Sequence, residues 1–191
     1  MSKLETNTID TVSGTSTLQV GSTNTSTITL GVSGDTINIP SGATIANSGT
    51  ATGFGANTPS FSAYDANNQT IPNTTYTLLE FDTESFDTDS AYNTSNYKFT
   101  VPSGKGGKYL IGCAVKTLAA ADRLILRLEK NDANTFYSES NSDSNGSVQF
   151  NLLMDLSASD HLKVAVYQNS GGNLLLEGGS GTNAFYGYKL I

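Results

Sequence analysis

Apolar and polar residues alternate with a period of two through most of the C-terminal two thirds of the chain. This alternation is typical of β-strands that bury one face and expose the other. It predicts long strands within residues 108–116, 123–129, 147–156 and 161–167, and shorter ones within 76–81, 97–101 and 183–191. The predicted inward-facing side chains are Tyr109, Ile111, Cys113, Val115, Leu124, Leu126, Leu128, Val148, Phe150, Leu152, Met154, Leu156, Leu162, Val164 and Val166. Those predicted to face outward are Arg123, Arg127, Glu129 and Lys163.

Segments rich in Gly, Asn and Pro separate these strands, as at residues 101–107 and 169–173. Such residues favour turns. No segment carries a convincing helical repeat. Many short strands joined by turns are typical of antiparallel sandwiches and jelly rolls, so we predict an all-β fold that is either an antiparallel sandwich or a jelly roll.

The first part of the chain has a different pattern. Its apolar residues come in spaced pairs that recur every eight to ten residues among Gly, Thr and Ser. The set is Leu18 and Val20, Ile28 and Leu30, Ile37 and Ile39, and then Ile45. Regular β-branched pairs favour short stacked or wrapped strands, whereas tracts rich in Gly, Ser and Thr are otherwise typical of flexible linkers. We interpret residues 21–56 as a fibrous β-shaft.

A single copy of this shaft has too few apolar side chains to fold alone. Their burial cannot offset the entropy lost when the backbone of the whole repeat is ordered. Several chains wound around one axis would share these side chains in a common interior and leave the Thr and Ser residues in water. The pattern therefore predicts an oligomer, most simply a homotrimer, with those seven residues as the shaft core.

Composition divides the chain near residue 56. Residues 1–56 contain one aromatic residue, Phe54, while all nine Tyr and the other seven Phe lie further along. We predict three segments: a polar N-terminus at residues 1–20, the shaft at residues 21–56, and a head at residues 57–191 that is long enough for its own core.

Charge and hydropathy argue against several classes of function. The net charge is −7 and the basic residues are scattered, which does not suit a nucleic-acid groove. No apolar run approaches the length of a membrane span. The N-terminus MSKLETNTID lacks the apolar region of a secretory signal, so we expect synthesis in a cytoplasm without export by that route. The single Cys113 allows no intrachain disulfide.

The segment EFDTESFDTD, residues 80–89, groups carboxylates at spacings of two or three. Calcium binds several carboxylate and carbonyl oxygens at once, so one interpretation is a calcium site. Its candidate ligands are Asp82, Glu84, Asp87 and Asp89. The other interpretation is a solvated acidic strand edge and turn, which discourages pairing with other sheets. No other cofactor is implied.

Catalytic chemistry has little support. His161 is the only histidine and no nucleophile motif accompanies it, so a catalytic triad is unsupported. Cys113 falls on an apolar strand face, where a core thiol is expected. Paired carboxylates would suit a glycosidase only across a sugar-binding cleft, for which a short shaft and a compact head leave little material. We expect a protein without enzymatic activity.

Several aromatic residues fall in segments that are otherwise rich in Asn, Ser and Gly. Aromatic rings combined with adaptable hydrogen-bonding groups are typical of loops that recognise carbohydrates or proteins. The candidate receptor-binding residues are Tyr92, Tyr97, Phe136, Tyr137 and Tyr167. The alternative for each of them is a place in the core or in an interface between copies.

Residues 59–191 resemble the complement C1q-like globular domain. The matching motifs, in order along the chain, are Phe61-Ser62-Ala63, Phe81, Phe86-Asp87 with Tyr92, Phe99 with Val101-Pro102, Gly107 with Tyr109, Lys130-Asn131, Leu156 with Asp160 and Leu162, and Phe185 with Gly187. The resemblance implies a ten-stranded jelly roll of the tumour-necrosis-factor type that packs as a trimer. The chain departs from the family in a longer turn at PSGKGGKY and in Ser159, where the family has a Gly.

The Thr/Ser/Gly-rich shaft is similar to those of tail-fibre and head-fibre proteins of tailed phages. That resemblance implies a trimeric virion protein, made in the host cytoplasm, whose N-terminus docks to the particle and whose head recognises a glycan or protein on the host surface. Two alternatives remain open: a head-fibre or decoration protein that attaches to or stabilises the capsid, and an envelope polysaccharide hydrolase.

Overall fold

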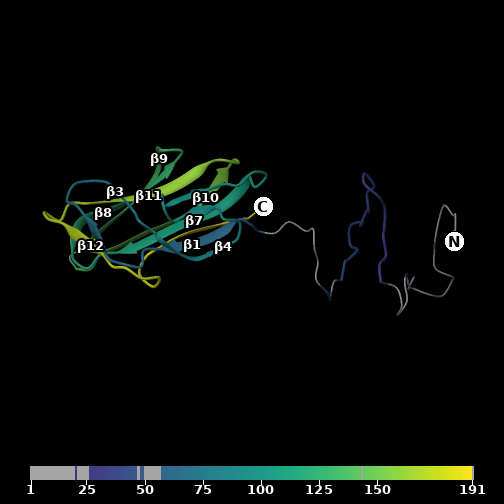
Figure 1. Ribbon diagram of the computed structural model, residues 1–191, viewed down its shortest axis with the longest axis horizontal. Coiled ribbons are helices and arrows are strands. Elements are labelled where there is room, and N and C mark those ends of the chain that lie inside the picture. The colour runs from purple at the N-terminus through teal and green to yellow at the C-terminus, as the bar shows by residue number, and fades with distance from the viewer. Residues whose placement is uncertain (1–19, 21–25, 47, 50–56, 143, 191) are drawn as a thin grey trace. The chain divides into compact units, whose positions relative to one another are not determined.

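The computed structural model describes residues 20, 26–46, 48–49, 57–142 and 144–190 (Figure 1). They fall into two units, one within residues 1–52 and one within residues 53–191, and each is described by itself. Residues 1–20 lie outside the described residues except for Val20, and Leu18 of the predicted shaft core lies outside them too. The boundaries of the three predicted segments stay a prediction. Among the described residues there is no helix that could cross a membrane.

The second unit, the head, is built from antiparallel sheets (Figure 1). The first sheet has the order β10 (Ser147–Leu156), β7 (Gly107–Lys116), β13 (Ala184–Lys189), β1 (Ser60–Tyr64) and β4 (Thr83–Asp87). The second has the order β5 (Tyr92–Asn93), β6 (Lys98–Thr100), β11 (His161–Gln168), β8 (Ala121–Lys130) and β9 (Ala133–Ser142), with β3 (Thr77–Leu78) also paired to β11. A short ribbon joins β12 (Leu174–Leu176) to β2 (Gln69–Ile71). The head is a jelly roll, which confirms the predicted all-β fold class.

The side chains predicted to face inward form the core between the two sheets. Of the fifteen, Leu152 and Met154 are partly buried against the core and the other thirteen are buried. Phe61 of β1 stacks on Phe99 of β6 with ring centroids 4.5 Å apart, so the two sheets meet through aromatic rings. Phe185 of β13 packs edge-on against Phe61 at 5.1 Å. The period-two alternation therefore identified the buried faces of the long strands.

The chain enters and leaves the head at the same end. The backbone N–H of Lys189 donates to the carbonyl of Pro59 at 3.0 Å, and that of Leu190 donates to the carbonyl of Lys108 at 2.7 Å. The opposite end is made by β12 and the loops beside it (Figure 1). Surfaces near β12 are therefore remote from the point where the preceding chain joins the head.

Two residues of the head show how local sequence and tertiary context combine. Ser159, where the C1q-like family has a Gly, adopts a φ of 73°, in the left-handed region that Gly favours.

Glu129 points to the outward face of β8 as predicted, yet it is only 7% exposed. Arg127 and Lys163 both pair with its carboxylate, so the burial of this charge is compensated.

The first unit contains two β-turns in the predicted shaft. The N–H of Asp35 donates to the carbonyl of Val32 at 3.0 Å, and the N–H of Ala43 donates to that of Pro40 at 3.1 Å. The third residue of each turn is a Gly with positive φ, 97° at Gly34 and 86° in the second turn, as such turns require. The two turns lie eight residues apart, the lower limit of the repeat seen in the sequence.

Residues 26–46 form no strand in this single chain. Six of the seven predicted shaft-core residues are described, and their side chains are exposed: Val20, Ile28, Leu30, Ile37, Ile39 and Ile45. A single copy offers them nothing to pack against, as the sequence implied. Their burial in a three-chain shaft stays a prediction.

Candidate functional site

Three tyrosines and one arginine gather on the outer face of the second sheet, and we call this group the tyrosine cluster. It consists of Tyr76, Tyr137, Tyr167 and Arg127. Strand pairing positions them: Arg127 of β8 lies directly opposite Tyr137 of β9, and Ala165 of β11 lies opposite Arg127 on its other side. Tyr167 follows two residues along β11, on the same face. Tyr76 directly precedes β3, which pairs with β11.

The rings of the cluster are in contact. The centroids of Tyr76 and Tyr167 lie 5.2 Å apart with an interplanar angle of 41°, and those of Tyr76 and Tyr137 lie 6.5 Å apart at 64°. The guanidinium carbon of Arg127 lies 4.0 Å from the ring centroid of Tyr76. Burial raises the pKa of Tyr76, so its hydroxyl stays protonated at neutral pH. Tyr137 is the most open member, with 49% of its surface exposed.

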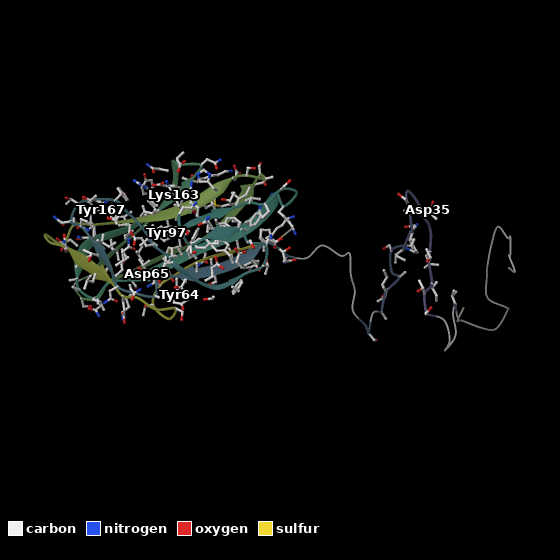
Figure 2. All side chains as sticks on the ribbon, in the orientation of Figure 1. Asp35, Tyr64, Asp65, Tyr97, Lys163 and Tyr167 are labelled. Carbon is white, nitrogen blue, oxygen red and sulfur yellow. The ribbon has the colours of Figure 1, made fainter. Side chains whose placement is uncertain are left out.

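Ion pairs surround the tyrosine cluster. Arg123 and Glu139 form a two-point pair, with Nε to Oε1 at 2.6 Å and Nη2 to Oε2 at 2.8 Å, and the Arg123 guanidinium holds the pKa of the Glu139 carboxyl below its usual range. Arg127 pairs with Glu129. The ammonium Nζ of Lys163 forms ion pairs with Oδ1 of Asp132 at 2.7 Å and with Oε2 of Glu129 at 3.3 Å. Figure 2 shows Lys163 and Tyr167 on the same side of the head.

The structure brings two of the five candidate receptor-binding residues together, Tyr137 and Tyr167. Tyr76 was missed by the sequence analysis. Its only signal was its place at the start of a predicted strand, because the register that brings β3 beside β11 is not visible in the sequence.

The other three candidates lie elsewhere. Tyr92 is a correction: it is 4% exposed, stacks on Phe61 in the core and donates its hydroxyl to the carbonyl of Phe81 at 3.0 Å. Phe136 is half-buried, with its ring edge-on to Phe150. Tyr97 is half-buried in the turn between β5 and β6. Of these residues, Tyr92 is placed where it cannot reach a partner.

Three of the four candidate calcium ligands have separate partners within the protein. Asp82 accepts hydrogen bonds from the N–H of Ala66 and the hydroxyl of Thr83. Asp87 accepts two backbone N–H bonds, from Asp89 and Tyr92, and Asp89 lies 3.3 Å from Lys105. Glu84 is exposed on β4. Within the described part of the chain, no three His, Cys, Asp or Glu side chains are grouped to hold a metal ion, and calcium binding stays an untested prediction.

The two residues considered for catalysis are held in structural roles. His161 Nε2 lies 3.3 Å from an oxygen of Asp132 at the start of β11. Cys113 is buried in β7, and burial raises the pKa of its thiol, so it stays protonated. A protonated thiol is a poor nucleophile.

The outer face of the first sheet carries several apolar and aromatic side chains, and we call it the Leu153 face. Leu153 is 74% exposed, and Leu110 and Tyr188 continue its row across β7 and β13. Phe86 of β4 is 52% exposed. Tyr186 lies over Gly112 and donates its hydroxyl to Asn151 at 2.9 Å. Beside this face, a groove between β9 and β10 is lined by apolar side chains that include Phe136, Leu152 and Met154.

No protein-family model matches the chain, and no curated protein matches it. Among solved structures, the globular domain of zebrafish complement 1qA protein is similar over 70% of this chain and 98% of its own, with a TM-score of 0.51 and 18% identity. A phage protein, PRD1 vertex protein P5, is similar over 72% of this chain and 100% of its own, with a TM-score of 0.56 and 17% identity. Murine APRIL is similar over 69% of this chain and 98% of its own, with a TM-score of 0.56 and 11% identity. These similarities show that the head has the C1q/TNF-like jelly-roll fold.

Proposed function

We propose that this protein is a structural virion protein of a tailed phage, a homotrimeric fibre whose head recognises a receptor on the host surface. The tyrosine cluster carries the proposal. It exposes aromatic surface among side chains that donate and accept hydrogen bonds, and this combination suits recognition of a glycan or a protein. The similarity of the head to a phage vertex protein supports a place in the virion.

The position of the tyrosine cluster supports a receptor-binding role. Tyr167 lies directly before Gln168, whose side-chain amide donates to the carbonyls of Ile71 and Gly172 near β12. This is the end of the head opposite Pro59 and Lys189 (Figures 1 and 2). The tyrosine cluster therefore lies at the end of the head remote from Pro59, the side from which the preceding chain enters.

The Leu153 face supports self-association. Covering its exposed apolar side chains with a second copy would lower the free energy of the assembly. The apolar pairs of the shaft independently predict an oligomer. In a homotrimer, three tyrosine clusters act together, so weak individual contacts add up to firm attachment. The mechanism is multivalent binding without catalysis, cofactor, nucleic acid or membrane insertion.

Competition for adsorption tests the proposal. Full-length protein added to host bacteria before the phage should reduce phage adsorption. The double variant Tyr76→Ala, Tyr137→Ala should lose this effect, while Tyr64→Ala, on β1 of the other sheet, should keep it. A full-length protein that neither binds the cells nor competes would overturn the proposal.

A capsid decoration protein is the second candidate, because the phage protein with the similar fold is a vertex protein. In that role the protein attaches to or stabilises the capsid. Gold-labelled antibodies against the head, viewed on whole virions, distinguish the two: label at the tail tip supports the adhesin, and label over the capsid supports decoration.

A further inference from the structure

We propose that the tyrosine cluster binds an uncharged hexopyranose unit of a host-surface polysaccharide. This inference rests on the proposed receptor-binding function and specifies the chemistry of the receptor. The shape of the cluster, its charge and its surroundings point to this ligand.

The shape of the tyrosine cluster suits a sugar ring. Its rings are tilted by 41° and 64° to one another, so they form a stepped surface rather than a parallel stack. A flat ligand can lie against only one such ring at a time. A chair-shaped pyranose presents C–H groups on both faces and at its edges, and these groups can contact Tyr137 and Tyr167 together. The half-exposed ring of Tyr137 supplies the open aromatic face.

The charge of the tyrosine cluster favours an uncharged ligand. Each of the three cations has a carboxylate partner: Arg123 with Glu139, Arg127 with Glu129, and Lys163 with Asp132. A sugar carboxylate, sulfate or phosphate would have to displace one of these partners. The net charge of −7 also repels acidic polymers.

The surroundings of the tyrosine cluster favour a sugar over a protein. The strongest contacts at protein interfaces are side chains inserted into dry, well-packed pockets. The tyrosine cluster is ringed by partly exposed ion pairs, and the most exposed Leu and Phe side chains of the described head, Leu153 and Phe86, lie on the other sheet. Ion pairs at this exposure still offer donors and acceptors to sugar hydroxyls. Arg123 and Glu139, beside Tyr137, are placed to do this.

Binding of the full-length protein to immobilised oligosaccharides tests the inference. The panel holds uncharged glucose, galactose, mannose and N-acetylhexosamine oligomers and, at equal density, uronic-acid and sialylated ones. We expect binding to one or more uncharged oligomers that persists when NaCl is raised from about 0.15 to 0.5 M, because salt screens charge-based binding. Tyr137→Ala and Tyr76→Ala should each weaken binding about tenfold. A tenfold loss of affinity corresponds to about 1.4 kcal/mol, the free energy of one aromatic contact.

Two further variants make the test specific. Tyr137→Phe keeps the ring and should retain binding, and Tyr64→Ala changes a tyrosine on β1 of the other sheet and should also retain it. Thermal unfolding of each variant shows whether the head remains folded. Reducing-end release from the bound oligomers is measured in the same samples, and we expect none.

The outcomes separate this inference from the proposed function. Binding only to uronic-acid or sialylated oligomers, lost at high salt, would overturn the uncharged ligand and leave the receptor-binding function standing. Binding to host cells that protease treatment of the cells abolishes, with no oligosaccharide bound, would overturn the sugar and indicate a protein receptor. Binding to uncharged oligomers that Tyr76→Ala and Tyr137→Ala leave unchanged would place the site elsewhere.

Discussion

Arg127 lies over the ring of Tyr76, with its guanidinium carbon 4.0 Å from the ring centroid. Tyr76 belongs to the segment that leads into β3, and Arg127 belongs to β8, so this contact fixes the segment against the second sheet. The same guanidinium pairs with the buried Glu129. Arg127 therefore links the buried carboxylate of Glu129 to the tyrosine cluster on the same face of the sheet.

Replacing Arg127 should weaken both the fold and the tyrosine cluster. Arg127→Ala removes the partner above Tyr76 and leaves Glu129 with Lys163 alone, so we expect a loss of about 1–3 kcal/mol in the free energy of unfolding. Denaturant titration followed by tyrosine fluorescence measures it. Arg123→Ala, an exposed neighbour on the same strand, is the control and should leave the midpoint unchanged. Equal effects of the two variants would contradict this role of Arg127.

Asp160 should make the head less stable in acid. Hydrogen bonds from Lys130 and Asn131 lower the pKa of Asp160 to about 2, below the ordinary value of 3.8. A carboxyl with a lowered pKa in the folded state stabilises the fold above its unfolded pKa, and the contribution disappears as the pH falls towards the folded pKa. The stability difference between the wild type and Asp160→Asn should therefore narrow between about pH 4 and 2. Denaturant titrations across this range check it, and a constant difference would contradict it.

Gly112 should not tolerate a larger residue. A Cβ atom at Gly112 would lie 2.4 Å from the Tyr186 ring, so the ring would have to leave the sheet surface. We expect Gly112→Ala to lower the free energy of unfolding by about 1–3 kcal/mol. Gly172→Ala is the matched control, since no atom lies within 4 Å of the corresponding Cβ and its φ is not in the left-handed region. A tolerated Gly112→Ala would show that the Tyr186 ring moves freely.

The Leu153 face should bury against another copy. Leu153→Arg places a charge in the proposed interface, so we expect trimers to dissociate at higher protein concentrations than the wild type. Analytical ultracentrifugation over a dilution series measures this against the chain mass of 20.0 kDa. Leu175→Arg, an exposed leucine on β12, is the control. A wild type that is monomeric throughout the series would contradict the homotrimer.

The shaft should depend on its apolar pairs. The double variant Ile37→Ser, Ile39→Ser should make residues 26–46 more sensitive to protease while the unfolding midpoint of the head stays the same. Val32→Ser, which changes an exposed residue outside the apolar pairs, should leave protease resistance unchanged. Unchanged resistance in the double variant would contradict the three-chain shaft.

The sequence alone determined the long strands β7, β8, β10 and β11 and their buried faces, but it did not reveal β9. Side chains on a strand alternate between its two faces, so the inward direction of Leu126 and Val164 is a local property that two neighbouring residues reveal. The turn signals are local too, because Gly34 and Gly42 supply backbone conformations that other residues disfavour. The fold class followed from these signals.

Only the tertiary structure decided which aromatic residues meet at the surface. Tyr92 and Tyr137 stand among similar polar residues, yet Tyr92 is in the core because it lies opposite Phe99 in the pairing of β5 with β6. Tyr76, Tyr137 and Tyr167 converge because β3, β8, β9 and β11 pair in one particular register. Register depends on the packing of the whole core and on the turn lengths, so residues distant in the chain become neighbours only when the entire sandwich has formed.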